Sequence, residues 1–182
     1  MLGRRPIAIS LLLLSALPLA GVVRAIEVLD VPWRPTPGMD GIIGDAEYPA
    51  PSPVSNCSLY LCQDTNYLYV AVSIPDPTYN ASDGITICIG TEPPSPERTP
   101  RVDDYRMTLS RSGAFTTTGF TSYKYATTTD SGGWRFEVAM GLPELETTPG
   151  QYKSLGFALF IRDDGKEVAR WPDDADQESP KN

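Results

Sequence analysis

The stretch that decides the fold is Tyr67-Leu68-Tyr69-Val70-Ala71-Val72-Ser73-Ile74, in which large aliphatic residues alternate with tyrosine or small residues. This alternation predicts a β-strand that packs against a core on one side only. The preceding segment, 55–63, alternates in the same way, and Asp64-Thr65-Asn66 between the two segments is typical of a turn. We therefore predict a β-hairpin.

The rest of the chain repeats this pattern of short strands and turns. Alternating strands are predicted at 84–91, 105–110, 134–140, 154–162 and 167–171, with two edge strands within 114–129 joined near Gly119. Asp163-Asp164-Gly165-Lys166 predicts a second hairpin, and the proline-rich segment 92–100 predicts a loop. No segment predicts a long helix. We predict an all-β fold, a jelly-roll-like β-sandwich in a single domain.

The expected core follows from the aligned residues of these strands. It comprises Leu68, Val70, Val72, Ile85, Ile87, Phe136, Val138, Phe157 and Leu159.

The first 25 residues read as a secretory signal peptide. Arg4 and Arg5 precede an apolar run, and Val23-Arg24-Ala25 offers small residues at a cleavage point. We expect residues 26–38 to form an N-terminal strand segment (26–34) and a proline-rich linker, and residues 39–182 to form the sandwich. No later run approaches the ~18 apolar residues needed to cross a bilayer, so we expect a secreted protein, free or at the cell surface, with no membrane span.

The charge of the chain narrows the classes of function. The full sequence has 15 basic and 23 acidic residues, and without the three arginines of the leader the balance is 12 to 23, a net charge of −11. Such a surface repels phosphate backbones, which argues against nucleic-acid partners and favours cations or glycans. Histidine is absent, which excludes Ser-His-Asp triads and histidine-ligated zinc.

We do not expect an enzyme. The remaining acids that could take part in catalysis lie on or beside turns, and so short a chain has no insertion that would form a deep cleft. Glu137 is an exception because it lies in the middle of a predicted strand, where it is expected to form a surface ion pair with Arg135.

Several motifs occur in a familiar order. They are Met39–Tyr48 with its Asp-Gly step, Asn66–Val72, Gly133–Leu145, Gly156-Phe157 and Trp171-Pro172. Together they resemble the family 9 carbohydrate-binding modules and their DOMON-like relatives. The resemblance implies a non-catalytic sandwich, often with bound calcium, that holds sugar ends between aromatic side chains.

The acids at turns are candidate calcium ligands, because calcium takes six to eight oxygen ligands. One set lies in the opening segment and consists of Asp40, Asp45 and Glu47. The other lies near the C-terminal hairpin and consists of Asp163, Asp164, Asp173, Asp174 and Asp176. The alternative for both sets is a solvated acidic turn.

Three aromatic residues beside prolines are candidate sugar platforms, because flat rings pack against the apolar face of a pyranose. They are Trp33, Tyr48 and Trp171. The alternative is that they anchor loops or belong to the core. Trp134 alternates with core residues and is interpreted as structural.

Two asparagines fit the acceptor motif for N-glycosylation in an exported protein, Asn56 and Asn80, with Asn80 better placed in a loop. The three cysteines, Cys57, Cys62 and Cys88, allow at most one internal disulfide. Cys62 and Cys88 lie on the polar faces of their predicted strands and are the pair we predict. The alternative is three buried free thiols.

Two functions remain. The first is a self-assembling subunit of an extracellular tube or filament, whose partners are other copies of the chain. It is suggested by a resemblance in format to small secreted archaeal proteins, including the cannula-forming proteins, and would use donation of the strand at 26–34 and calcium bridging. The alternative is a module that binds glycans outside the cell.

Overall fold

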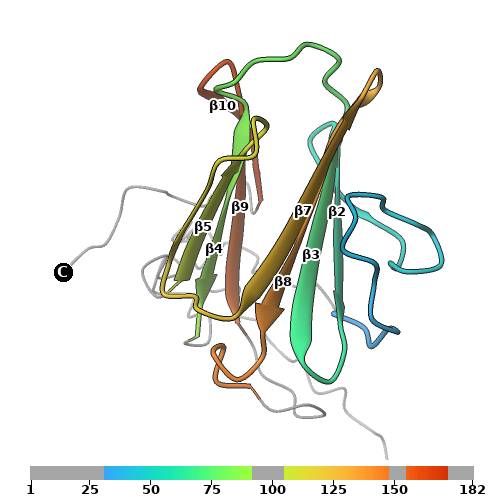
Figure 1. Ribbon diagram of the computed structural model, residues 1–182, viewed down its shortest axis with the longest axis vertical. Helices are drawn as coiled ribbons and strands as arrows, with labels where there is room; N and C mark the ends of the chain where they lie inside the picture. The colour runs from blue at the N-terminus through green and yellow to red at the C-terminus, as the bar shows by residue number, and fades with distance from the viewer. Residues whose placement is uncertain (1–30, 92–104, 148–154, 172–182) are drawn as a thin grey trace, which may run out of the picture.

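The chain forms two five-stranded antiparallel sheets that face each other (Figure 1). The computed structural model describes residues 31–91, 105–147 and 155–171, so the predicted leader and residues 26–30 lie outside the described residues. Sheet A runs in the order β1 (Ser52–Val54), β2 (Cys57–Gln63), β3 (Tyr67–Ile74), β8 (Gly133–Gly141), β7 (Tyr123–Asp130). Sheet B runs in the order β10 (Lys166–Trp171), β9 (Gly156–Asp163), β4 (Gly84–Gly90), β5 (Tyr105–Ser110), β6 (Phe115–Thr118). The predicted β-sandwich is confirmed.

The strands also pair as the sequence predicts. β2 and β3 form the first hairpin and β9 and β10 the second. The described residues contain no helix, and so none that could span a membrane. The short strand β1 was not predicted.

The core lies between the two sheets and is built from the aliphatic faces of the strands. At its centre Val70 of β3 lies opposite Val138 of β8, and Val72 lies opposite Phe136. Eight of the nine predicted core residues are buried, and Phe157 packs against them half-buried. Each buried side chain of this size stabilises the fold by about 1.5–3 kcal/mol relative to exposure. The core prediction is confirmed.

The segment before β1 packs on its own sheet. Trp33 forms a parallel bridge with Gln63 at the end of β2. The Arg34 N–H donates to the Gln63 carbonyl over 2.9 Å, and the Gln63 N–H donates to the Pro32 carbonyl over 3.0 Å. Residues 31–34 of the predicted donor strand therefore lie against β2 of the same chain, and these hydrogen bonds would have to break before a neighbour accepted them.

The opening loop that follows covers the outer face of sheet A. Tyr48 is buried there in one cluster with Cys62, Tyr69, Ala71 and Ala139. Both faces of the middle of sheet A are therefore closed to solvent.

A single buried carboxylate, that of Glu137 on β8, holds this loop. Its Oε2 accepts hydrogen bonds from the backbone N–H groups of Gly41 (2.7 Å) and Asp40 (3.1 Å), and its Oε1 accepts one from the Tyr48 hydroxyl (2.8 Å). The predicted surface pair with Arg135 is wrong, because Glu137 is fully buried under the loop. Arg135 instead pairs with Asp130 at the surface over 2.6 Å.

Gly41 brings the loop backbone close to β7. Its φ is +81°, and a Cβ there would lie 2.2 Å from Thr128 Oγ1 and 3.0 Å from the Thr127 carbonyl carbon. Only glycine fits this approach. The Asp40-Gly41 step of the opening segment therefore has a packing role.

We expect Gly41→Ala to lower the free energy of unfolding by about 3 kcal/mol, because strain at positive φ adds to a clash with β7. Gly113→Ala is the matched control, since Gly113 has φ +88° but open space around it, and about 1 kcal/mol of strain alone is expected there. Urea denaturation of both variants measures the difference. Equal losses of unfolding free energy in the two variants would mean that the close contact between Gly41 and β7 does not require glycine.

Burial raises the pKa of Glu137, although three hydrogen bonds favour its ionised form. An acid whose folded-state pKa is raised binds its proton more tightly in the folded state, so its contribution to stability falls as pH rises above the unfolded value of 4.5. Glu137→Gln cannot titrate, and it keeps an oxygen for the backbone N–H groups and an amide for Tyr48. We expect the variant to gain stability relative to the wild type as the pH rises from about 4 to about 7 in urea melts. A constant difference across that range would contradict this expectation.

Candidate functional site

The candidate site lies at the end of the sandwich where the loop 75–83 crosses from sheet A to sheet B, the upper end in Figure 1. Strand β3 ends here and β4 begins here. The turns of the β1–β2, β7–β8 and β9–β10 hairpins lie at the same end. Loops at the end of a rigid sandwich commonly carry binding residues.

Three carboxylates meet at this end. Oxygen atoms of Asp76, Asp83 and Asp163 all lie within 4.8 Å of one another. Asp76 follows β3, and its Oδ1 accepts hydrogen bonds from the N–H (2.9 Å) and hydroxyl (2.6 Å) of Thr78. Asp83 precedes β4, is fully buried, and accepts the N–H groups of Asn80 and Asp164, each over 3.0 Å.

Arg111, in the turn after β5, supplies the positive charge of the cluster. Its Nη1 donates to Asp76 Oδ2 over 2.9 Å and to Asp83 Oδ2 over 3.3 Å, and its side chain is 1% exposed. Its Nη2 donates to the Asp76 carbonyl over 3.0 Å. The guanidinium carbon also lies 5.4 Å from the centre of the Tyr79 ring and 6.0 Å from that of Trp134. Arg111 therefore ties the β3–β4 loop to both sheets.

Asp163, at the end of β9, is the third acid of the cluster. Burial, with the negative charges of Asp76, Asp83 and Asp164 adding to it, raises the pKa of Asp163. Its carboxyl is a candidate hydrogen-bonding group for a neutral polar ligand.

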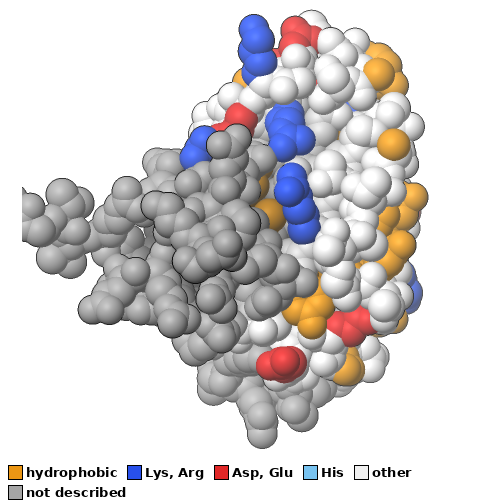
Figure 2. Space-filling view, turned by 90° about the vertical axis from the view of Figure 1, so that its left-hand side faces the viewer, with side chains coloured by type: hydrophobic (Ala, Val, Ile, Leu, Met, Phe, Trp, Pro, Cys, Tyr) orange, Lys and Arg blue, Asp and Glu red, His pale blue; other side chains and the backbone are white. Residues whose placement is uncertain are grey.

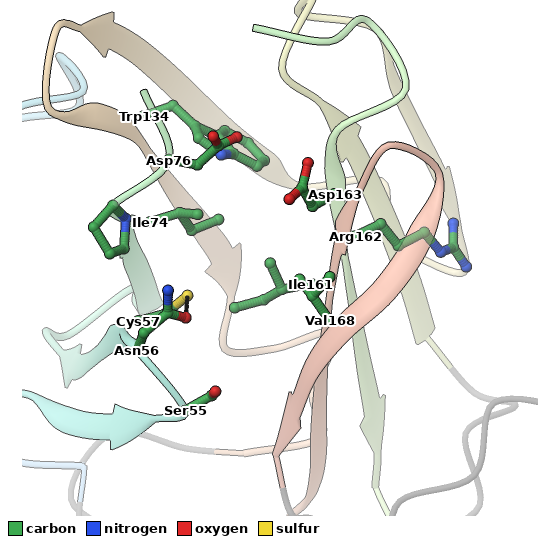
Figure 3. A pocket seen from close by; sticks show the side chains of 11 residues that line it. Ser55, Asn56, Cys57, Ile74, Asp76, Trp134, Ile161, Arg162, Asp163 and Val168 are labelled. Atoms are coloured by element: carbon green, nitrogen blue, oxygen red, sulfur yellow. Dashed lines mark hydrogen bonds between the residues drawn. The ribbon is translucent and has the colours of Figure 1, made fainter. Parts of the chain in front are cut away.

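A cavity of about 340 Å³ opens between the two sheets beside these acids (Figure 3). Its apolar walls are Ile74, Trp134, Ile161 and Val168. Its polar side chains come from Ser55 and Asn56 in the β1–β2 turn, from Asp76, and from Asp163 at the end of β9, whereas the Arg162 side chain points away from the cavity. Asp76 and Trp134 lie on one side, with Asp163 and Ile161 facing them on the other. An apolar wall with a few polar groups at its rim is the usual composition of a small-molecule site.

The carboxylate trio does not fit a calcium ion. Calcium needs six to eight oxygen ligands. Oxygens of Asp76 and Asp83 already accept hydrogen bonds from Arg111, and their other contacts are to Thr78, Asn80 and Asp164. The Arg111 guanidinium already compensates the negative charge of Asp76 and Asp83, as a bound cation would.

Among the described residues, the predicted calcium ligands are not brought together in one site. The Asp40 carboxylate accepts a hydrogen bond from the Ile42 N–H (2.8 Å), and the Glu47 carboxylate accepts one from the Gly38 N–H (3.0 Å). Both contacts stabilise the opening loop itself. Among the described residues the one group of three acids within ligand distance is the trio, which contains Asp163 but not Asp40, Asp45, Glu47 or Asp164. Asp173, Asp174 and Asp176 lie outside the described residues, so calcium binding there stays a prediction.

The predicted sugar platform of three aromatic residues does not form. Tyr48 is buried with its hydroxyl on Glu137. Trp171 is buried and packs against Phe157, with ring centres 5.8 Å apart. The prediction is wrong for these two, because both rings fill apolar space inside the fold. Trp33 is 47% exposed, but it lies at the opposite end of β2 from the cavity.

The predicted Cys62–Cys88 disulfide is wrong. All three cysteines are free and buried, with Cys62 under the opening loop of sheet A and Cys88 on the outer face of sheet B. Burial raises the pKa of Cys57 and Cys88 to about 11 and that of Cys62 to about 12, so the thiols stay protonated and unreactive.

The two candidate glycosylation sites differ in accessibility. Asn56 is exposed in the β1–β2 turn. Asn80 is half-buried, donates to Asp164 and accepts the N–H (3.0 Å) and hydroxyl (2.8 Å) of Ser82. Glycosylation stays a prediction for both, and Asn56 is the more exposed of the two.

On the outer face of sheet B the described residues of β5 and β6 carry basic and hydroxyl side chains, whereas Phe160 of β9 is buried there with Cys88 and Ala158. Figure 2 shows Lys and Arg side chains along this face, where Arg106, Thr108, Thr116 and Thr118 lie on β5 and β6. The exposed aromatic residues of the described chain are Trp33, Tyr79 and Tyr125. Of these, Tyr79 lies at the cavity end, next to Arg111.

Sequence reasoning missed Asp76, Asp83 and Arg111. Asp76-Pro77-Thr78 and Asn80-Ala81-Ser82-Asp83 are turn-forming patterns, and these could have indicated ordered acids. Nothing in the sequence around Arg111 indicates burial.

No family model and no curated protein sequence matches the chain. The fold is similar to a family 9 carbohydrate-binding module from Caldicellulosiruptor kristjanssonii in complex with cellotriose. The TM-score is 0.59 and the identity 21%, over 77% of this chain and 81% of that chain. The module in complex with glucose gives a TM-score of 0.58 at 21% identity, over 76% and 82% of the two chains. The fold that the resemblance implies is confirmed.

We expect Arg111→Met to lower the free energy of unfolding by about 3–5 kcal/mol, because it leaves Asp83 buried without its counter-charge. Arg135→Met removes the exposed ion pair with Asp130 and should cost less than about 1 kcal/mol. Urea denaturation at neutral pH separates the two. Similar losses in both variants would mean that the Arg111 cluster is solvated like a surface pair.

Proposed function

We propose that this chain is a non-catalytic carbohydrate-binding protein, and that the cavity at the open end of the sandwich holds the sugar. The observation that carries the proposal is this cavity with polar rim and apolar wall, in a fold shared with solved complexes of cellotriose and glucose. Its volume of about 340 Å³ lies in the usual range for small-ligand sites.

The cavity offers the two kinds of contact that sugar recognition uses. The Asn56 amide can both donate to and accept from sugar hydroxyls, and the Asp163 carboxyl can accept from them. Ile161 and Val168 provide an apolar surface for the C–H face of a pyranose, and Val168 is largely exposed. Neutral sugar suits this acidic rim better than an anionic ligand.

The same geometry argues against hydrolysis at this site. A glycosidase needs one carboxylic acid and one free carboxylate across the scissile bond. Of the two acids at the cavity, Asp76 is ion-paired with Arg111 and held by Thr78. It is therefore unsuited to the role of nucleophile or base.

Nothing in the comparisons supports a filament subunit built by donation of the N-terminal strand. The cis contacts of residues 31–34 with Gln63 also disfavour donation of that part of the segment. Glycan binding is therefore the function that we propose. It would take place outside the cell if the predicted leader directs export.

Isothermal titration of the full chain with cellotriose and with glucose tests the proposal. We expect binding of at least one sugar, and at least about tenfold weaker binding for Asn56→Ala and for Asp163→Ala, since each removes one hydrogen-bonding group. Thr116→Ala, on the outer face of sheet B, is the control and should bind as the wild type does.

Two results would overturn the proposal. One is the absence of binding to either sugar by a folded wild-type protein. The other is binding that Asn56→Ala and Asp163→Ala leave unchanged, which would place the sugar elsewhere. Release of glucose from cellotriose during the titration would contradict the non-catalytic assignment.

A further inference from the structure

Sandwiches have open sheet edges, and three of the four here are blocked. β1 has three residues including Pro53, β6 has four residues, and β10 has a register irregularity between Glu167 and Ala169. Short strands, proline and bulges are the usual protections against pairing with another chain. β7 has none of these, because it is eight residues long, lacks proline and glycine, and pairs with β8 in one unbroken register.

The free backbone groups of β7 can be assigned. The Gly141 N–H donates to the Ser122 carbonyl over 2.9 Å, which makes Ser122 and Gly141 a hydrogen-bonded pair. Such pairs alternate along antiparallel strands, so the backbone groups of the even-numbered residues of β7 face β8. Tyr125, Thr127 and Thr129 therefore direct their N–H and C=O groups away from the sheet, and no residue of β7 is buried.

We propose that β7 pairs with β7 of a second copy, antiparallel and centred on Thr127, so that the two A sheets become one continuous sheet across a two-fold axis. In this register Tyr125 lies opposite the partner's Thr129 on one face, and Ala126 lies opposite the partner's Thr128 on the other. A self-complementary edge of this kind gives a closed dimer.

Charge selects this register. Centring on Thr127 places Lys124 opposite the partner's Asp130, twice in the dimer, and every other two-fold register separates these charges. Arg135 and the Gly132 N–H hold the pKa of Asp130 below its usual range, so the carboxylate is charged at neutral pH. Opposite charges in directly opposed strand positions stabilise the pairing, and they do so here in a chain of net charge −8.

Side chains of β7 are also held by contacts within the monomer. The ring of Phe115 on β6 stacks on Tyr125 with centres 4.4 Å apart and planes 5° apart, and on Tyr123 at 4.8 Å. Lys124 Nζ lies 4.8 Å from the centre of the Tyr67 ring. Side chains that are already held by such contacts lose little conformational freedom when the strand pairs.

Sedimentation velocity of the full chain over a range of concentrations tests the dimer. We expect a concentration-dependent dimer whose dissociation constant rises at least about tenfold in Lys124→Glu, because Glu would oppose Asp130. Lys166→Glu on β10 makes the same change in net charge away from this edge, and it should leave the dimer intact. The double variant Lys124→Glu with Asp130→Lys should restore it.

Amide hydrogen exchange of the wild type tests the register without substitutions. With rising concentration, the amides of Tyr125, Thr127 and Thr129 should gain protection, whereas those of Lys124, Ala126 and Thr128 should not change. A protein that stays monomeric, equal weakening by Lys166→Glu, or protection confined to other strands would overturn the proposal. Since Asp130 also holds the β7–β8 turn, a double variant that fails to fold leaves the exchange pattern as the deciding result.

Discussion

The buried carboxylate of Glu137 is the contact on which the arrangement of the outer layer depends. It accepts two backbone N–H groups and one tyrosine hydroxyl from the opening loop, so removal of the acceptor leaves three donors without partners in a closed space. By holding that loop on sheet A, Glu137 buries Tyr69 and Cys62 on a face that the sandwich would otherwise leave open. The middle of this face is therefore closed to a ligand.

Arg111 performs the matching role at the open end with the opposite charge. A buried guanidinium paired with Asp76 and Asp83 fixes a loop of polar residues that has little apolar surface of its own to bury. Breaking such a pair is costly, because the remaining charge stays buried. The fixed loop leaves Asp163 beside the cavity in a defined position, which lowers the entropy cost of binding a ligand there.

The sequence predicts the features that depend on local periodicity. It misses the features that depend on packing against a segment distant in the sequence. Strand alternation indicated β3, both hairpins and the core, because a period of two assigns each residue to a face. It could not show that the second face of β3 is also buried, since the covering loop lies about twenty residues upstream and its contact is a glycine backbone on Glu137. Because the sequence did not show that the opening loop covers this face, the predictions for Tyr48 and for the Cys62–Cys88 pair were wrong. Arg111 was missed because a single arginine in a hairpin turn is usually solvated.

The position of the cavity bears on what pairing at β7 would achieve. β1 and β7 are the opposite edges of sheet A, and the cavity takes residues from the β1–β2 turn and the β9–β10 hairpin. Contact along β7 therefore leaves both cavities of a dimer open. If each cavity binds sugar as proposed, two sites held on one sheet would bind a repeating polymer more tightly than either site alone, because the second site then binds at high effective concentration.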